Sequence, residues 1–203
     1  MDKKLFIGDS HIFSCFSSDE DIMYIIDITL NKIRKGGSDL NVRYSDYDKV
    51  IESDRYTIDE EGDSIIEIIN ESEHNHIVLS IGEIDVRYHL INQLSSNKNA
   101  IIDIVSIYGK FLDKIDKNKK ISICSITPPG IDNANKYTKM INQRSEITIS
   151  LNLLLKDLCE LNGYGYIDLY SNYQIGGILD NTKSDGGVHI HSRFIESNLN
   201  KIK

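Results

Sequence analysis

Short apolar runs alternate along this chain with longer segments in which apolar residues recur every three or four positions. The short runs predict buried strands, and the longer segments predict amphipathic helices. The predicted strands cover residues 4–7, 76–81, 120–126 and 164–169. A repeated order of strand and then helix is typical of an α/β fold with a parallel sheet.

The longer segments predict most of the helical content. We expect helices over residues 19–35, 59–73, 100–117 and 136–161, and a last helix that begins near His189. Residues 38–58 are rich in turn formers and predict one further strand, at 40–44 or 49–51. In a parallel sheet of this kind, ligands bind in the crevice at the carboxyl ends of the strands. Chemistry is therefore expected in the segments that directly follow the predicted strands and in the loop before the last helix.

Length and composition limit the classes of function. The 203 residues suit a single core, so we expect residues 1–203 to form one domain. Hydrophobic residues make up 40% and charged residues 27%, as in ordinary water-soluble globular proteins. The formal net charge of −8 argues against nucleic-acid binding. No run reaches the roughly 18 apolar residues of a membrane span, so neither nucleic acid nor membrane is an expected partner.

The cysteines and the N-terminus bear on the cellular compartment. Cys15, Cys124 and Cys159 lie in apolar contexts and show neither Cys-x-x-Cys nor zinc-like spacing. Met1 is followed almost at once by the first apolar run, which leaves no room for the apolar segment of a secretory signal. We therefore expect reduced, buried cysteines and a cytoplasmic protein.

The tetrapeptide Gly8-Asp9-Ser10-His11 follows the first predicted strand. A serine at a strand-to-helix turn has an exposed hydroxyl, and the backbone N–H groups of the helix start point at any anion formed there. Many hydrolases hold their nucleophile in this way, although surface loops use the same Gly-Asp-Ser turn. The motif needs support from the rest of the chain.

A second group of reactive side chains follows the second predicted strand. Residues 82–89 contain Glu83, Asp85, Arg87 and His89. Charged groups so near a buried strand need partners. They form either part of a site at the carboxyl end of the sheet or an exposed loop with a local pair between Arg87 and an acid, worth at most about 1 kcal/mol.

The third motif joins Asp185 to His189 through the flexible pair Gly186-Gly187. Two glycines let the backbone fold tightly, so the carboxylate can bond one ring nitrogen while the other nitrogen faces the crevice. That arrangement is the orienter-and-base half of a Ser-His-Asp triad. A glycine turn with a capping aspartate has the same letters, but the serine turn upstream favours the triad.

Taken together, Gly8-Asp9-Ser10, residues 82–85 and residues 185–189 resemble the SGNH, or GDSL-type, hydrolase superfamily. The resemblance spans nearly the whole chain. It implies a flavodoxin-like three-layer α/β/α sandwich with a five-stranded parallel sheet, in agreement with the strand count above. It also implies acyl transfer from an ester, with the oxyanion held by backbone N–H groups and an asparagine.

The resemblance assigns roles to individual residues. Ser10 would be the nucleophile, His189 the base and Asp185 the carboxylate that orients it. The residues expected to bind the oxyanion or the substrate are Asp9, His11, Gly82, Glu83, Asp85 and Arg87.

The chain departs from the family pattern in the block that normally reads Gly-x-Asn-Asp. Ile84 stands in place of the asparagine, so one oxyanion donor is missing. Loss of such a donor typically lowers the rate about 100- to 1000-fold. Arg87 is the candidate that replaces it, unless its guanidinium clamps a carboxylate or phosphate of the substrate.

Two smaller departures concern spacing. Three residues, where the family usually has two, separate Asp185 from His189, and the two intervening glycines can absorb the extra residue. His11 replaces the leucine that often follows the serine, and it either lines the pocket or caps the turn. The glycine of the second family block has three candidates, Gly36, Gly37 and Gly62.

We predict a serine esterase or acyltransferase that acts on a small acyl ester, plausibly on a carbohydrate, without cofactor or metal. One alternative is a non-hydrolytic domain that binds a sugar or anionic ligand through Glu83, Asp85 and Arg87. A second is a glycan-modifying transferase that uses an activated donor. Metal binding is disfavoured because the pairs His74-x-His76 and His189-x-His191 lack a third ligand at regular spacing.

Overall fold

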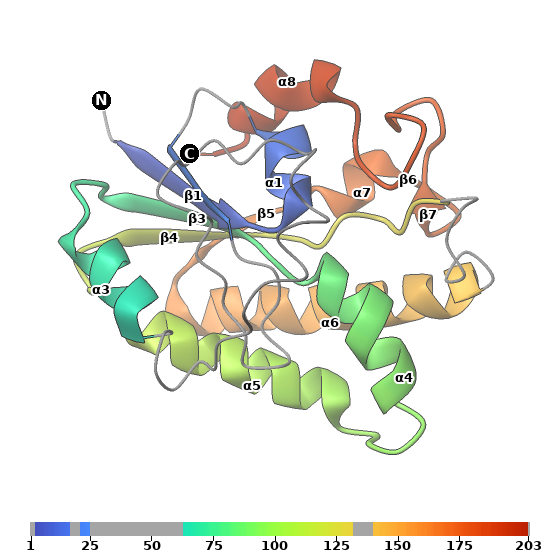
Figure 1. Ribbon diagram of the computed structural model, residues 1–203, viewed down its shortest axis with the longest axis horizontal. Helices are drawn as coiled ribbons and strands as arrows, with labels where there is room; N and C mark the ends of the chain where they lie inside the picture. Colours follow the sequence, from blue (N-terminus) through green and yellow to red (C-terminus); the bar gives the residue numbers. More distant parts are fainter. Residues whose placement is uncertain (1–2, 17–20, 25–62, 132–139, 203) are drawn as a thin grey trace.

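The computed structural model describes residues 3–16, 21–24, 63–131 and 140–202. The element order is strand, helix and strand again along most of this length (Figure 1). The predicted α/β class with a parallel sheet is therefore confirmed. Within the described residues, no helix has both the length and the apolar character needed to cross a membrane.

The strands of the main sheet are all parallel and lie in the order β2-β1-β3-β4-β5. Their bounds are β1 Lys4–Gly8, β2 Asp21–Tyr24, β3 His76–Ser80, β4 Lys120–Cys124 and β5 Gly165–Ile167. The register pairs Gly8 with Ser80 and Leu79 with Ile123. The carboxyl ends of β1, β3 and β4 consequently meet at one edge of the sheet, where the sequence analysis expected the chemistry.

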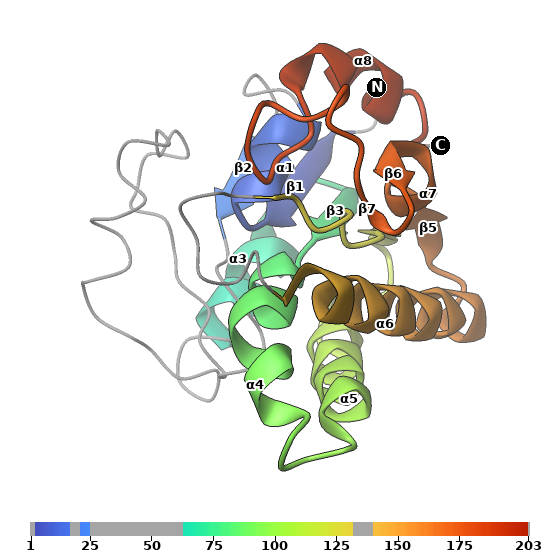
Figure 2. The same cartoon turned by 90° about the vertical axis from the view of Figure 1, so that its right-hand side faces the viewer.

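Helices cover both faces of this sheet (Figures 1 and 2). The helices of one face are α3 Asp63–Glu71, α5 Ala100–Asp113 and α6 Ile141–Asn162, and those of the other face are α1 Ser10–Cys15, α7 Tyr170–Tyr173 and α8 Ile195–Leu199. Successive side chains of a strand point to opposite faces, so Leu5 and Ile7 pack against the first set while Phe6 packs against the second. Both faces are buried, which explains why the strands are apolar without alternation.

The structure corrects two of the helices expected from the sequence. The helix expected over residues 19–35 is wrong at Asp21–Tyr24, because these residues form β2. The rest of that helix lies outside the described residues. The same holds for the strand expected within 38–58 and for the three candidate glycines of the second family block. The last helix begins at Ile195, after a 3-10 turn over Ser192–Phe194, and not near His189. His189 lies instead in a buried bend, and Ile190 after it bridges to Ser184 and packs in the core.

The segment after β3 is helical, which the sequence analysis did not predict. A π-helix over Asp85–Leu90 continues into α4, Ile91–Gln93. Its apolar side chains Ile84, Val86 and Leu90 are buried, and the charged residues between them conceal this helical spacing in the sequence. A two-stranded hairpin of β6 Gln174–Ile175 and β7 Ile178–Leu179 was also missed.

Candidate active site

The turn from β1 to α1 presents the serine motif at the carboxyl edge of the sheet. Asp9 caps the helix, because its carboxylate accepts a hydrogen bond of 2.9 Å from the backbone N–H of His11. A side chain at Gly8 would place its Cβ only 2.4 Å from the Ser80 carbonyl oxygen, so the close approach of β1 and β3 requires glycine there. Ser10 is the first residue of α1.

Asp9 and His11 form a buried pair in this turn. His11 Nδ1 lies 3.0 Å from Asp9 Oδ1, and the two side chains are 2% and 1% exposed. Burial alone would raise the pKa of Asp9, but His11 and the charge of Arg87 hold this pKa below its ordinary value. Burial would likewise lower the pKa of His11, but Asp9 and Glu83 raise it. Both shifts favour a carboxylate beside an imidazolium.

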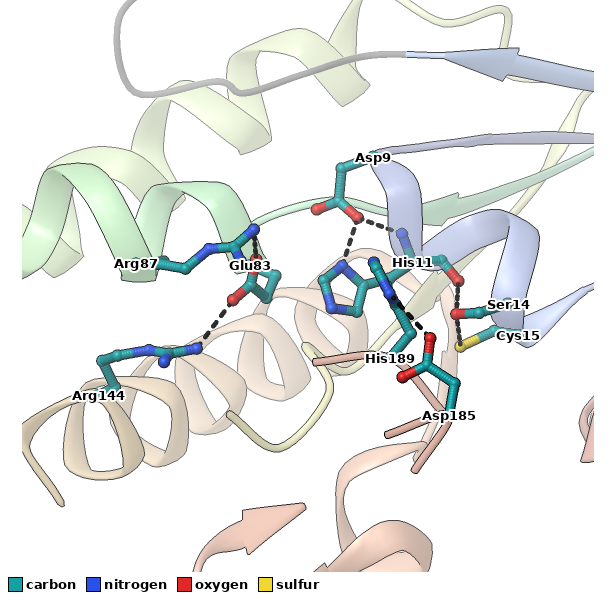
Figure 3. Close-up of polar contacts among 9 residues, drawn as sticks. All are labelled: Asp9, His11, Ser14, Cys15, Glu83, Arg87, Arg144, Asp185 and His189. Carbon is teal, nitrogen blue, oxygen red and sulfur yellow. Dashed lines mark hydrogen bonds and ion pairs between the residues drawn. The ribbon is translucent and has the colours of Figure 1, made fainter. Parts of the chain in front are cut away.

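The loop before η5, the 3-10 turn at Ser192–Phe194, brings His189 to the same place (Figure 3). His189 Nδ1 lies 3.4 Å from Asp185 Oδ2. Gly186 has a φ of 100°, a backbone conformation that residues other than glycine rarely adopt. This turn accommodates the third residue between Asp185 and His189. The structure thus brings the predicted base and its predicted orienter together, with His189 buried and the Asp185 side chain 43% exposed.

The two histidines of the site are in contact. Their ring centroids are 4.6 Å apart, and the planes are inclined by 52°. Burial, followed by the neighbouring charge of His11, lowers the pKa of His189 to about 4, against the opposing effect of Asp185, Glu83 and Asp9. The opposite shifts favour a protonated His11 and a neutral His189, so that His189 can accept a proton.

A second buried cluster lies beside these histidines and consists of Glu83, Arg87 and Arg144 (Figure 3). Arg87 Nη2 is 2.8 Å from Glu83 Oε2, and Arg144 Nη2 is 3.1 Å from Glu83 Oε1. Arg144 also donates to the Gly130 carbonyl oxygen, at 3.3 Å. The pair of Glu83 and Arg87 expected from the sequence exists, but it is buried within a helix and not in an exposed loop.

Arg144 was missed by the sequence analysis. It lies on α6 and is only 1% exposed. A signal was available, because residue 144 precedes the buried Ile147 and Leu151 by three and seven positions and so lies on the apolar stripe of the helix. A single cation on such a stripe indicates a buried partner.

Two further predicted site residues, Gly82 and Asp85, face the core of the protein. Gly82 has a φ of 128°, and its missing side chain leaves room for Ile126. Asp85 is fully buried and lines an apolar cavity with Tyr108 and Leu155, between the sheet and the helices α5 and α6. Asp85 is therefore placed toward the core and not toward the histidine pair.

A small pocket opens at the carboxyl ends of β1, β3 and β4. It has a volume of about 10 Å³. Among the described residues, three buried polar atoms of its lining have no hydrogen-bond partner, His11 Nε2, Thr127 Oγ1 and Glu83 Oε2, and the last of these is in an ion pair with Arg87. Residues that line the pocket are Asp9, His11, Ser80, Ile81, Glu83, Ile126 and Thr127.

Asn152 of α6 fixes the wall of this pocket. Its Oδ1 accepts from the Ile126 N–H at 2.7 Å, and its Nδ2 donates to the Ile126 carbonyl oxygen at 3.0 Å. These bonds replace the strand ladder that ends at Cys124 and hold the chain where Pro128 stops further pairing. The position of Thr127 in the pocket follows from that anchor.

The structure does not test the predicted contact of the serine, and its described part gives no candidate metal site. The side chain of Ser10 lies outside what the structure describes, so the predicted contact between Ser10 and His189 stays a prediction. In the described part of the chain, no group of three or more His, Cys, Asp or Glu side chains is arranged to hold a metal ion.

Comparisons with known proteins support the fold. No family model matches the sequence, and no curated protein matches it. Solved structures do match: an aryl esterase of M. smegmatis has a TM-score of 0.57 at 9% identity, covering 97% of this chain and 94% of that one. A carbohydrate acetylesterase family member from Sinorhizobium meliloti also has a TM-score of 0.57, at 14% identity, with 98% and 95% covered.

A third match is Est24, a carbohydrate acetylesterase from the same species, with a TM-score of 0.55, 12% identity and coverage of 98% and 94%. Identities this low establish the architecture alone. The resemblance to the SGNH or GDSL-type hydrolases drawn from the sequence is confirmed at the level of the fold.

Proposed function

We propose that this protein is a serine esterase of the SGNH type, in which Ser10, His189 and Asp185 form the triad of a flavodoxin-like sandwich. The observation that carries the proposal is the contact of 3.4 Å between His189 and Asp185 beside the turn that ends at Ser10. Residues 9–11 and 185–189 are far apart in the sequence, yet the fold buries a histidine from each in contact with the other. Burial of polar side chains is unfavourable, so this contact favours a functional role.

In this mechanism His189 accepts the proton of the Ser10 hydroxyl as the serine oxygen attacks the ester carbonyl carbon. The imidazole is suited to this step because its lowered pKa keeps it neutral at pH 7. Asp185 holds Nδ1, so the other ring nitrogen takes the proton and then passes it to the leaving alcohol. A water molecule then releases the acid by the same steps and restores the free serine.

The substrate class proposed is a small acyl ester, with an acylated carbohydrate as the first to test. Two of the matching structures are described as carbohydrate acetylesterases and another as an aryl esterase. A second hydroxyl compound that replaced water as acceptor would make the protein an acyltransferase. Product analysis with added alcohol acceptors distinguishes the two outcomes.

The binding-domain alternative has less support. It required Glu83, Asp85 and Arg87 to face a ligand. Both oxygens of Glu83 are instead in ion pairs with arginines, and Asp85 is fully buried toward the core. These groups stabilise one another, which leaves the histidine pair as the better candidate for the chemistry.

The test is intact-mass labelling with a fluorophosphonate, which reports an activated serine without knowledge of the substrate. We expect one adduct on the unmodified protein and none on Ser10→Ala or His189→Ala. His74→Gln is the matched control, since His74 precedes β3 at the opposite end of the sheet, and it should label like the unmodified protein. No adduct on the unmodified, folded protein would overturn the proposal.

A further inference from the structure

The reaction proposed above creates an oxyanion, and the described side chains offer few donors for it. A negative charge that develops on a carbonyl oxygen is stabilised by donors held in place before the reaction. Ile84 has no polar atom, and Arg87 is engaged with Glu83 at 2.8 Å. The donor must therefore be sought among the atoms that line the pocket beside the serine turn.

His11 Nε2 has the required properties. The His11 side chain is 2% exposed, and Nε2 has no hydrogen-bond partner among the described residues. An unpartnered buried polar atom is unfavourable unless something binds to it. Nδ1 is held by Asp9 at 3.0 Å, so an imidazolium at this position presents its second N–H, on Nε2, as the free one.

The pocket at His11 fits an oxygen atom. Its volume of about 10 Å³ is close to the smallest space that holds one water molecule, roughly 10–15 Å³. Thr127 Oγ1, which also has no hydrogen-bond partner among the described residues, adds a second donor. The His189 ring lies 4.6 Å from the His11 ring, so the proposed base and the proposed donor are neighbours in the site.

The charges around His11 favour its protonated form. Asp9 and Glu83 raise the pKa of His11, while burial and Arg87 lower it, and the balance lies above the ordinary value. His189 is the remaining titratable group in contact with the ring, and its lowered pKa keeps it neutral. The exposed Asp185 acts on His189.

We infer that the His11 side chain, held by Asp9, donates from Nε2 to the carbonyl oxygen of the substrate ester and stabilises the oxyanion in place of an asparagine. This inference rests on the proposed esterase function. It makes His11 a catalytic residue and Asp9 a positioning residue that keeps His11 charged. The Asp9 carboxylate also offsets the repulsion between His11 and the imidazolium that forms on His189 during the reaction.

The first experiment measures the pH dependence of ester hydrolysis by the unmodified protein, Asp9→Asn and His74→Gln. In the unmodified protein, kcat/KM should rise as pH passes about 4, where His189 loses its proton, and fall as pH rises through the raised pKa of His11. Asparagine keeps the helix cap but removes the charge. The alkaline limb should therefore move to lower pH in Asp9→Asn, while His74→Gln shows no such change.

The second experiment replaces the donor itself. His11→Leu should lower kcat about 100- to 1000-fold with little change in KM, as expected for the loss of one oxyanion donor. His11→Gln, which keeps an N–H, should retain more activity and lose the alkaline limb. If His11→Leu fails to fold, His11→Gln and Asp9→Asn still decide the matter.

The outcomes separate this inference from the proposed function. Fluorophosphonate labelling that is retained together with unchanged kcat and an unchanged alkaline limb in His11→Gln would overturn the role of His11 alone. Absence of labelling and hydrolysis in the unmodified protein would overturn the esterase. Titration of His11 by ¹⁵N NMR, independent of activity, should show a pKa above the ordinary 6.5; a pKa below 6.5 would also overturn the inference.

Discussion

Two clusters of buried charge lie side by side in this protein, and they differ in how their charges are matched. In one cluster, Glu83 forms ion pairs with Arg87 and Arg144. In the other, Asp9 and Asp185 hold two histidines whose rings are in contact and whose pKa values are shifted in opposite directions. The first cluster occupies both oxygens of its acid, whereas the second leaves His11 Nε2 without a partner among the described residues.

The difference indicates different roles. Charges that leave water need partners, and ion pairs between residues of different elements hold those elements together. Arg144 connects α6 to Glu83 and to Gly130 in this way. Titratable groups whose pKa values are pushed apart suit a site that moves protons. We therefore assign support to the arginine cluster and chemistry to the histidine cluster.

The largest expected effect on stability comes from the arginine cluster. Arg144→Met removes one partner from a buried pair and leaves Glu83 with Arg87 alone, so the free energy of unfolding should fall by about 3–5 kcal/mol. Urea denaturation monitored by circular dichroism measures the change. At urea concentrations below its unfolding transition, the variant should still react with a fluorophosphonate.

The matched control for that variant is Arg193→Met. Arg193 is exposed and donates to the Thr182 carbonyl oxygen, so its loss should change the free energy of unfolding by less than about 1 kcal/mol. Equal small losses in both arginine variants would contradict the supporting role of the buried cluster.

An intermediate effect is expected from pH acting on the histidine cluster. The pKa of His189 is lowered from 6.5 to about 4 by folding, so between these values the unfolded chain binds a proton that the folded protein does not. Stability should therefore fall as pH decreases through this window, by about 3 kcal/mol in total. His11, whose pKa is raised, contributes stability that is fully present below 6.5 and is lost only at higher pH.

Urea midpoints measured from pH 4.5 to 7 test this expectation. The slope should be present in the unmodified protein and in His74→Gln, and it should be reduced in His189→Gln. A slope of the same size in His189→Gln would show that other groups carry the dependence.

The smallest effect on stability is expected for Asp185→Asn. The Asp185 side chain is 43% exposed and 3.4 Å from His189, so its loss should change the free energy of unfolding by less than about 1 kcal/mol. Its effect on the reaction should be larger, because Asp185 raises the pKa of His189 and orients the ring. We expect lower kcat and an acid limb displaced to lower pH in a pH–rate profile; unchanged values of both would mean that Asp185 is not the orienter.

Most of the candidate site could be predicted from short segments of the sequence. The turn at Gly8–Ser10 and the loop from Asp185 to His189 are each local, and each has glycines where the backbone requires them. The segment after β3 was harder to predict. Its buried apolar residues recur with helical spacing, but the charged residues between them gave the appearance of a loop.

The sequence by itself determined the α/β class, the order of the strands and helices along most of the described chain, and the pairing of Asp185 with His189. These features depend on local hydrophobic periodicity, turn residues and short separations. Only the tertiary structure decided that Arg144 neutralises Glu83, 61 positions away, and that His11 lies against His189. Such contacts join distant segments, and the pKa shifts they produce depend on desolvation by the whole fold, which no short stretch of sequence contains.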